Sequence, residues 1–450
     1  MEQARVSKAN MITEGVVWKG ILYFFFPILF GTFFQQLYNT VDAIIVGQFL
    51  GKEALAAVGG GTSTIINLLI GFFTGLASGA SVVISQRYGA DQKTRVQNAI
   101  HSAIMLSIVG GIIISIVGFV STDWSLELIG TPAEIMPLAS RYMKIYYAGA
   151  ITLVVYNMGS GVFRAIGDSR HPLYFLIAGC ITNIVLDLLF VAILRMGVEG
   201  AAYATVISQF VSMTLTLFFL KREKGELKFE FKRLKFVKEE TTSMLIIGFP
   251  AGIQSIMYTF SNLIIQSNIN SFGTDTAAAW AAYGKLDSMY WMIINAFGIA
   301  ITTFVGQNYG AHKGDRIRSG VRSTLLMSGV VSLGVSLIFT TLGRYGFMLF
   351  TGDKEVIDIG MIMVRTVVPT YITYICIEIL SGAIRGTGKA LLPTIFCITG
   401  VCLLRIVWLQ IAVPINRSVF TVCLCYPITW IVTSILFIIY YNHLKKKALF

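Results

Sequence analysis

The sequence predicts an all-α integral membrane protein made of two copies of one six-helix unit. Hydrophobic residues make up 55% of the chain and charged residues only 13%, whereas about a quarter of the residues of a soluble domain are charged. The apolar stretches are longer than the roughly 20 residues that cross a bilayer as a helix. Short motifs also recur at one fixed spacing, which is typical of an internal duplication.

The duplication is visible in residues that recur 221 positions apart. Gln86-Arg-Tyr-Gly-Ala90 returns as Gln307-Asn-Tyr-Gly-Ala311, and Arg164-Ala-Ile-Gly167 returns as Arg385-Gly-Thr-Gly388. In each copy, Tyr-Gly-Ala followed by polar residues is typical of a helix end and a restart. We therefore expect two units of about 220 residues each.

Twelve hydrophobic spans are expected, six in each copy. They cover approximately 20–46, 55–84, 97–120, 136–162, 172–194, 198–220, 243–270, 277–305, 320–342, 357–383, 392–413 and 418–442. The first span holds polar residues and lacks a cleavage-type ending, which favours a retained helix over a signal peptide. An even number of spans per copy makes the repeats parallel, so we expect two lobes around a central cleft.

The positions of the basic residues predict the orientation. Lys and Arg are concentrated in alternate loops, which places both termini in the cytoplasm by the positive-inside rule. This distribution accounts for the net charge of +12 without nucleic-acid binding. The expected division is 1–220 for the N-lobe with spans one to six, 221–240 for a cytoplasmic linker, and 241–450 for the C-lobe with spans seven to twelve. The linker is strongly charged, and we expect a solvated tether.

The sequence contains no motif of an enzyme. The six cysteines lie in apolar spans, and the four histidines are scattered near span ends. His-Glu-x-x-His and Gly-x-Ser-x-Gly are both missing from the sequence, so neither zinc-dependent nor serine hydrolysis is indicated. We expect neither enzymatic activity nor a bound cofactor.

Ionisable residues inside the spans are the candidate functional residues, because each costs at least about 2.5–3.5 kcal/mol at the centre of a membrane helix. Asp42 lies in the first span, Asn183 and Asp187 share one face of the fifth, and Thr205 lies in the sixth. Their depths agree to within several ångströms at about 1.5 Å of rise per residue. Such oxygens suit Na⁺, or a proton held between the carboxylates. The alternative is a cluster of interhelical hydrogen bonds without an ion.

The second half holds four further ionisable residues within its spans: Lys285, Asp287, Glu378 and Arg405. Asp287 and Arg405 have similar predicted depths, which predicts a buried ion pair between them. Alternatively, they line the central cleft and change partners or titrate during transport. Glu378 lies nearer the cytoplasmic end and fits less well as the partner of Arg405.

Four motifs together resemble the multidrug and toxic compound extrusion (MATE) transporters, in particular the bacterial multidrug-efflux branch. The first is Leu37-Tyr-Asn-Thr-Val-Asp-Ala-Ile-Ile-Val-Gly47. The others are the two repeated pairs described above and Lys285-Leu-Asp287. The resemblance extends over nearly the whole chain.

This resemblance implies export of cationic amphiphilic drugs by alternating access between the lobes, coupled to H⁺ or Na⁺ entry. It implies a multi-pass protein of the bacterial plasma membrane that contacts lipids and drugs, and we expect a monomer. In prokaryotic members, the cation site contains an acid in helix one, an Asn-x-x-x-Asp pair in helix five and a Thr in helix six. Asp42, Asn183, Asp187 and Thr205 match that pattern.

Two features of the second half argue against a cation site in the second lobe and against a different transport function. Some members use a site in the second lobe with an acid in helix seven, but Met244–Asn270 contains no acid. A lipid-linked oligosaccharide flippase of the same superfamily is the alternative function. Such a flippase needs a strongly basic cavity, and Lys285 and Arg405 are the only candidates for it.

Overall fold

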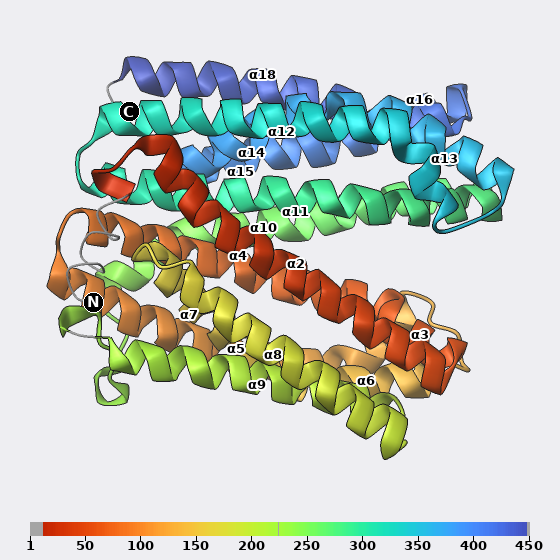
Figure 1. Ribbon diagram of the computed structural model, residues 1–450, viewed down its shortest axis with the longest axis horizontal. Coiled ribbons are helices and arrows are strands. Elements are labelled where there is room, and N and C mark those ends of the chain that lie inside the picture. The colour runs from red at the N-terminus through yellow and green to blue at the C-terminus, as the bar shows by residue number, and fades with distance from the viewer. Residues whose placement is uncertain (1–11, 224, 448–450) are drawn as a thin grey trace. The chain divides into compact units, whose positions relative to one another are not determined.

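The computed structural model describes residues 12–223 and 225–447, and in these ranges the regular structure is helical without any strand (Figure 1). The helices of the first half are α2 (Val17–Leu50), α3 (Lys52–Gly59), α4 (Gly61–Gly89), α5 (Lys93–Leu128), α6 (Met136–Ala148), α7 (Ala150–Ala165), α8 (Arg170–Asp187), the π-helical η1 (Leu188–Ile193) and α9 (Val198–Arg222). Short 3₁₀ turns, η2 (Gly225–Leu227) and η3 (Phe231–Arg233), follow.

The second half has a similar series of long helices. It contains α10 (Lys238–Asn270), α11 (Thr274–Gly310), α12 (Gly314–Met348), α13 (Lys354–Val367), the 3₁₀ turn η4 (Val368–Thr370), α14 (Tyr371–Gly386), α15 (Leu391–Phe396), the π-helical η5 (Cys397–Leu403), α16 (Leu404–Ile415), α17 (Val419–Cys423) and α18 (Cys425–Lys446).

The spacing of 221 found in the sequence recurs in the helix ends. The helices α4 and α11 end at Gly89 and Gly310, and α8 and α15 begin at Arg170 and Leu391. The turn after each Gln-x-Tyr-Gly-Ala motif contains a residue of positive φ: Asp91 at 53° and His312 at 56°. Asp and His adopt this left-handed conformation more readily than most side chains. The repeated motif thus forms the same helix end twice.

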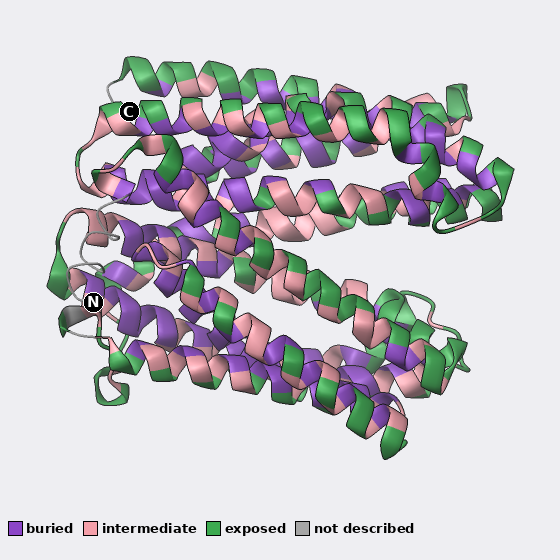
Figure 2. Cartoon of the chain, in the orientation of Figure 1, coloured by how far each residue is buried: buried purple, intermediate pink, exposed green. Residues whose placement is uncertain are grey.

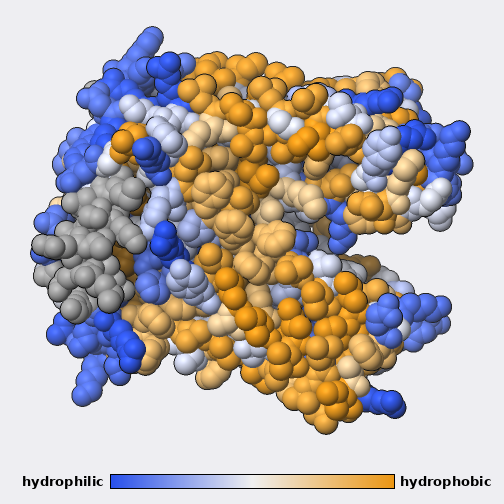
Figure 3. Space-filling view, in the orientation of Figure 1, coloured by the Kyte–Doolittle hydropathy of each residue, from blue (hydrophilic) through white to orange (hydrophobic). Residues whose placement is uncertain are grey.

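Eleven helices of the described residues are long and apolar enough to cross a membrane. The predicted span missing from that set is 136–162, which the structure divides at Gly149 into α6 and α7. Hydrophobic side chains cover the flanks of the helices, and hydrophilic residues gather near their ends (Figure 3). This is the surface of a multi-pass membrane protein.

The described chain folds into two compact units. The first consists of residues 26–256, and the second combines 257–447 with 12–25. Two helices therefore belong partly to each unit: α2 changes unit next to Pro27, and α10 changes unit a little after Pro250. The division at 220 and 240 concerns the sequence repeat and stays a prediction.

The most buried helix of each unit is the same member of the repeat. In the first unit α7 packs against α4, α5 and α9, and in the second α14 packs against α11, α12 and α18. Nearly all of α7 and most of α14 are buried, whereas α9 and α18 keep exposed faces (Figure 2). A helix that is apolar on all sides is expected at the centre of such a bundle.

The prediction of a solvated tether after α9 is wrong at two positions. The Phe229 ring is completely buried, and the Glu240 side chain is only 2% exposed. Glu240 accepts hydrogen bonds from Arg95 Nε at 2.8 Å and Arg87 Nε at 3.1 Å. The linker is bound to the first unit because it supplies one aromatic ring and one carboxylate that the unit can bury.

Candidate cation site

Asp42 and Asp187 meet in the first unit, between α2 and α8. Asp187 is the last residue of α8 and is completely buried, whereas Asp42 is partly buried. The two carboxyl groups are close enough for the charge of one to affect the other. The π-helical η1 begins immediately after Asp187. Such π-helical interruptions are frequent at functional sites.

Buried polar atoms of Asp42, Asp187 and Asn183 lack hydrogen-bond partners in the part of the chain that the structure describes. Asp42 Oδ1, both carboxylate oxygens of Asp187, and both amide atoms of Asn183 have no hydrogen-bond partner among the described residues. Buried polar groups in folded proteins nearly always have a partner, and two adjacent carboxylates repel each other when both are ionised. A proton or another cation between the carboxyl groups would remove this repulsion.

Asn183 and Thr205 occupy the helices that flank this pair. Asn183 is completely buried one turn before Asp187 in α8, and α8 packs against α9. The Thr205 hydroxyl donates to Ala201 O at 3.0 Å within α9, so its oxygen lone pairs remain free to accept or to coordinate. Within the described chain, no hydrogen bond joins Thr205 to Asn183 or to the aspartates. The structure brings Asp42, Asn183 and Asp187 to one place and leaves Thr205 beside them on the packed helix.

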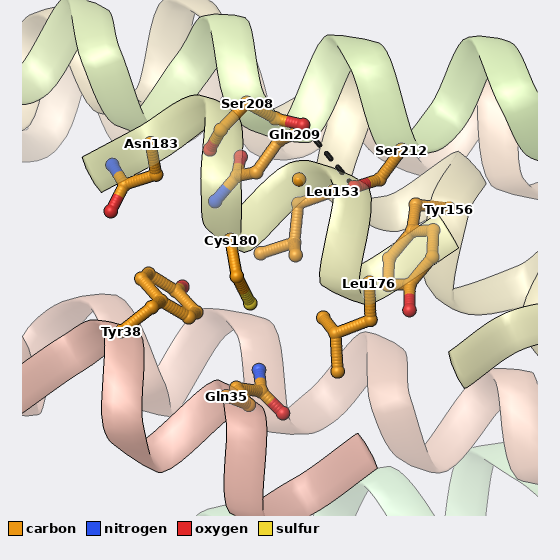
Figure 4. A pocket seen from close by; sticks show the side chains of 11 residues that line it. Gln35, Tyr38, Leu153, Tyr156, Leu176, Cys180, Asn183, Ser208, Gln209 and Ser212 are labelled. Atoms are coloured by element: carbon orange, nitrogen blue, oxygen red, sulfur yellow. Dashed lines mark hydrogen bonds between the residues drawn. The ribbon is translucent and has the colours of Figure 1, made fainter. Parts of the chain in front are cut away.

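A narrow cavity extends from Asn183 between α2, α7, α8 and α9 (Figure 4). It is lined by Gln35 and Tyr38 of α2, Leu153 and Tyr156 of α7, Leu176, Gly179, Cys180 and Asn183 of α8, and Ser208, Gln209 and Ser212 of α9. Its volume is about 30 Å³, and a single water needs about 10–15 Å³. The cavity can therefore hold a few waters, but not a drug.

Four of the polar residues that line this cavity were missed by sequence reasoning: Gln35, Tyr38, Ser208 and Gln209. Helical spacing could have found them. Tyr38 precedes Asp42 by one turn, and Ser208 and Gln209 follow Thr205 by three and four residues, which places them on the same faces. The polar character of these faces is the signal that was available.

The ionisable residues of the second unit have separate partners. Asp287 accepts hydrogen bonds from Tyr283 at 3.2 Å, from Trp291 at 2.6 Å and from Tyr371. Arg405 donates to Asn262 Oδ1 at 3.3 Å, and its guanidinium lies 4.3 Å from the centre of the Tyr426 ring.

The expected ion pair between Asp287 and Arg405 is not formed in the described residues: aromatic side chains donate to Asp287, whereas Arg405 lies against the Tyr426 ring and donates to Asn262. Glu378 accepts from Tyr374 at 3.4 Å, and Lys285 is exposed. The functional roles of Lys285, Asp287, Glu378 and Arg405 stay predictions.

The described residues contain no group of three or more His, Cys, Asp or Glu side chains that could hold a metal ion. A site made of Asp42, Asp187 and Asn183 offers only oxygen ligands and two negative charges. Such a set favours a proton or a hard, monovalent cation over a transition metal.

The chain matches known proteins along almost its whole length. It is 28% identical to the probable multidrug resistance protein YoeA of Bacillus subtilis (strain 168), over 96% of this chain and 95% of that one. It is 30% identical to the probable multidrug resistance protein YpnP of the same organism, over 85% and 86% of the two chains. A crystal structure of MATE in the bent conformation has the same fold, with a TM-score of 0.91, 24% identity and 98% of both chains covered.

The family assignment rests on both halves of the chain. The MatE family model matches residues 27–189 and 250–409, which include the Asp42 and Asp187 pair and the repeated loop motifs. Because this match extends over well over half of the sequence, the chain belongs to the MatE family, the MATE transporters.

Proposed function

We propose that this protein is an antiporter that exports cationic amphiphilic drugs from bacteria in exchange for H⁺ or Na⁺. The relatives YoeA and YpnP are named probable multidrug resistance proteins, which supports drug export. The observation that supports cation coupling most strongly is the contact between Asp42 and Asp187 without a donor. A drug efflux pump needs an energy source, and a cation that this pair binds can supply it.

The coupling is based on the repulsion between the two carboxylates. Without a cation, the two charges push α2 and α8 apart, and a proton or Na⁺ removes this cost and lets the helices approach. The helix that carries Asp42 also supplies residues 17–25 to the second unit, so a shift of α2 acts on both units. The drug must favour the other arrangement, since a ligand with equal affinity for both states shifts neither.

The architecture that fits this mechanism has twelve spans in two parallel-repeat lobes around a central cleft. The pair α6 and α7 then counts as one span with a break at Gly149. We place both termini in the cytoplasm and the protein in the bacterial plasma membrane, because the basic residues follow alternate loops. We propose that one chain is the working unit.

A lipid-linked oligosaccharide flippase is less well supported. Such a transporter needs several free basic groups for a pyrophosphate, whereas Arg405 is engaged by Asn262 and Tyr426. The names of the relatives also refer to multidrug resistance.

The test is ethidium efflux from proteoliposomes under a Na⁺ gradient alone and then under a pH gradient alone. Wild type should respond to one of the two gradients, and Asp42→Asn should lose that response while folding normally. The control is Asp275→Asn, which removes an exposed carboxylate at the start of α11 and should transport like wild type. Gradient-driven efflux that persists in Asp42→Asn would remove the proposed site, and no efflux by wild type under either gradient would favour the flippase.

A further inference from the structure

A basic groove lies between α12 and α18 in the second unit. It is lined by Arg318, Arg322, Leu325 and Leu326 of α12, by Tyr441 and Lys445 of α18, and by two small or buried neighbours. Its volume is about 530 Å³, which is within the usual range for small-molecule pockets of about 300–1,000 Å³. The proposed mechanism does not use this groove.

The groove has a basic mouth and an apolar interior. Arg322 and Lys445 are exposed, and within the described chain neither forms an ion pair with a carboxylate. Arg318 is partly neutralised by Asp315 at 2.7 Å. Leu326 lies two turns further along α12, about 12 Å from Arg318 at 1.5 Å per residue.

Exposed apolar side chains continue the groove along both helices. On α12, Leu326, Val330, Leu333 and Leu337 are 62%, 71%, 56% and 66% exposed, and their spacing places them on one face. On α18, Ile435 and Ile439 are 51% and 62% exposed. In a membrane protein, such a face is in contact with lipid tails.

In the first unit, the linker packs against α5 and α9 at the equivalent place. The positions 221 residues before Arg322 and Tyr441 are His101 and Leu220. The buried Phe229 ring stacks on the His101 ring with 5.4 Å between their centres. The Phe229 N–H donates to Leu220 O at 3.0 Å.

Further contacts hold the linker against α5. The Glu230 N–H donates to His101 Nε2 at 3.1 Å, and Arg233 donates to Gln97 Oε1 at 3.3 Å. Gln97 is the counterpart of Arg318. The first copy thus has Gln97 and His101 where the linker binds. The second copy has Arg318 and Arg322 at the matching positions, in the groove between α12 and α18.

We propose that an anionic phospholipid occupies the groove of α12 and α18, in the place that the linker takes in the first unit. Its phosphate lies between Arg322 and Lys445, and an acyl chain follows Leu325, Leu326 and the exposed face of α12. Guanidinium and ammonium groups bind phosphate strongly. Free phosphate or a soluble anion would use only the mouth of the groove and leave its apolar part empty.

The test is the binding of phosphatidylglycerol to the purified full chain in detergent, measured by native mass spectrometry and by the shift in melting temperature. Arg322→Gln/Lys445→Gln should weaken the tightest phosphatidylglycerol binding about 30-fold, since each basic residue near an anionic membrane surface contributes on the order of 1 kcal/mol. Phosphatidylcholine and inorganic phosphate should stabilise wild type much less than phosphatidylglycerol does.

Two controls separate this site from general attraction to a basic protein. Lys232→Gln/Lys235→Gln removes the same charge from exposed linker residues and should bind like wild type. The charge-conserving Arg322→Lys/Lys445→Arg should retain most of the binding. Equal binding by wild type and Arg322→Gln/Lys445→Gln, or equal stabilisation by inorganic phosphate, would overturn the proposal.

Discussion

Arg95 at the start of α5 donates from Nε to the buried carboxylate of Glu240 at the start of α10, with 2.8 Å between the two atoms. Arg87 at the end of α4 donates to the other carboxylate oxygen. The last residue of the linker thus joins both ends of the repeated Gln-x-Tyr-Gly-Ala loop. The loop motif that marks the duplication is held in place by a charge outside the motif.

Removing the Glu240 carboxylate should destabilise the first unit. Glu240→Ala leaves Arg87 and Arg95 without this partner, and breaking a buried ion pair costs about 3–5 kcal/mol, with the lower end expected here because both arginines are partly exposed. Thermal unfolding in detergent measures the effect. Glu239→Ala, which removes an exposed partner of Arg95, is the control and should cost less than about 1 kcal/mol. Equal losses in both variants would contradict the structure.

The contact of Asp42 with Asp187 predicts a stabilised but inactive variant. Asp187→Asn removes the repulsion, so its melting temperature without Na⁺ at pH 8 should exceed that of wild type by a few degrees, as a gain of about 1 kcal/mol would give. Lowering the pH or adding Na⁺ should stabilise wild type and leave Asp187→Asn nearly unchanged. Ethidium efflux should be lost in the variant. A wild type whose melting temperature responds to neither cation would contradict the proposed coupling.

The buried ring of Phe229 predicts that the linker contributes to stability. Phe229→Ala should cost about 3–5 kcal/mol, the usual range for a buried Phe, because it removes the ring that stacks on His101. Limited proteolysis should then cut the chain between α9 and α10 faster. Phe236→Ala, at a ring that is 47% exposed, is the matched control. If the two variants are cut at the same rate, the linker does not depend on Phe229.

The close approach of α4 and α10 in the first unit depends on glycine. A Cβ atom at Gly79 would lie 2.5 Å from Gly248 N and from Met244 O, and one at Gly75 would lie 2.4 Å from Gly252 N. Gly79→Ala should therefore destabilise the protein by about 1–3 kcal/mol, the range for overpacking.

A glycine with free space provides the comparison for Gly79. A Cβ atom at Gly329 in α12 would meet no atom within 4 Å. Gly329→Ala should be neutral or slightly stabilising, because alanine favours a helix by up to about 1 kcal/mol relative to glycine. Thermal unfolding of both variants measures the difference. The opposite order of stability would show that α4 and α10 do not approach as described.

The sequence was sufficient for the features that depend on composition and on the repeat. The helical class, most span ranges and the paired helix ends at Gly89 and Gly310 agree with the structure. Depth along the helices also pointed to Asp42 and Asp187 as neighbours, and their role in cation binding stays a prediction. Depth can be counted along one helix, so it does not require knowledge of how helices are rotated.

The features that depend on helix rotation or on partners distant in the chain could not be predicted from the sequence. Asp287 and Arg405 have similar depths, but depth alone does not show that aromatic side chains take up both groups. The break at Gly149 lies in an apolar run with no proline. The burial of Phe229 depends on a ring-sized gap beside His101 on a helix more than a hundred residues earlier.

The exchange of helix segments between the two units has a consequence for the ancestry of the chain. Residues 17–25 complete the second unit, and residues 238–256 complete the first. A single copy on its own would therefore lack one of these segments, and a second molecule would have to supply it. Two separate copies that exchanged these segments would form a segment-swapped homodimer, and fusion into one chain would make the exchange permanent.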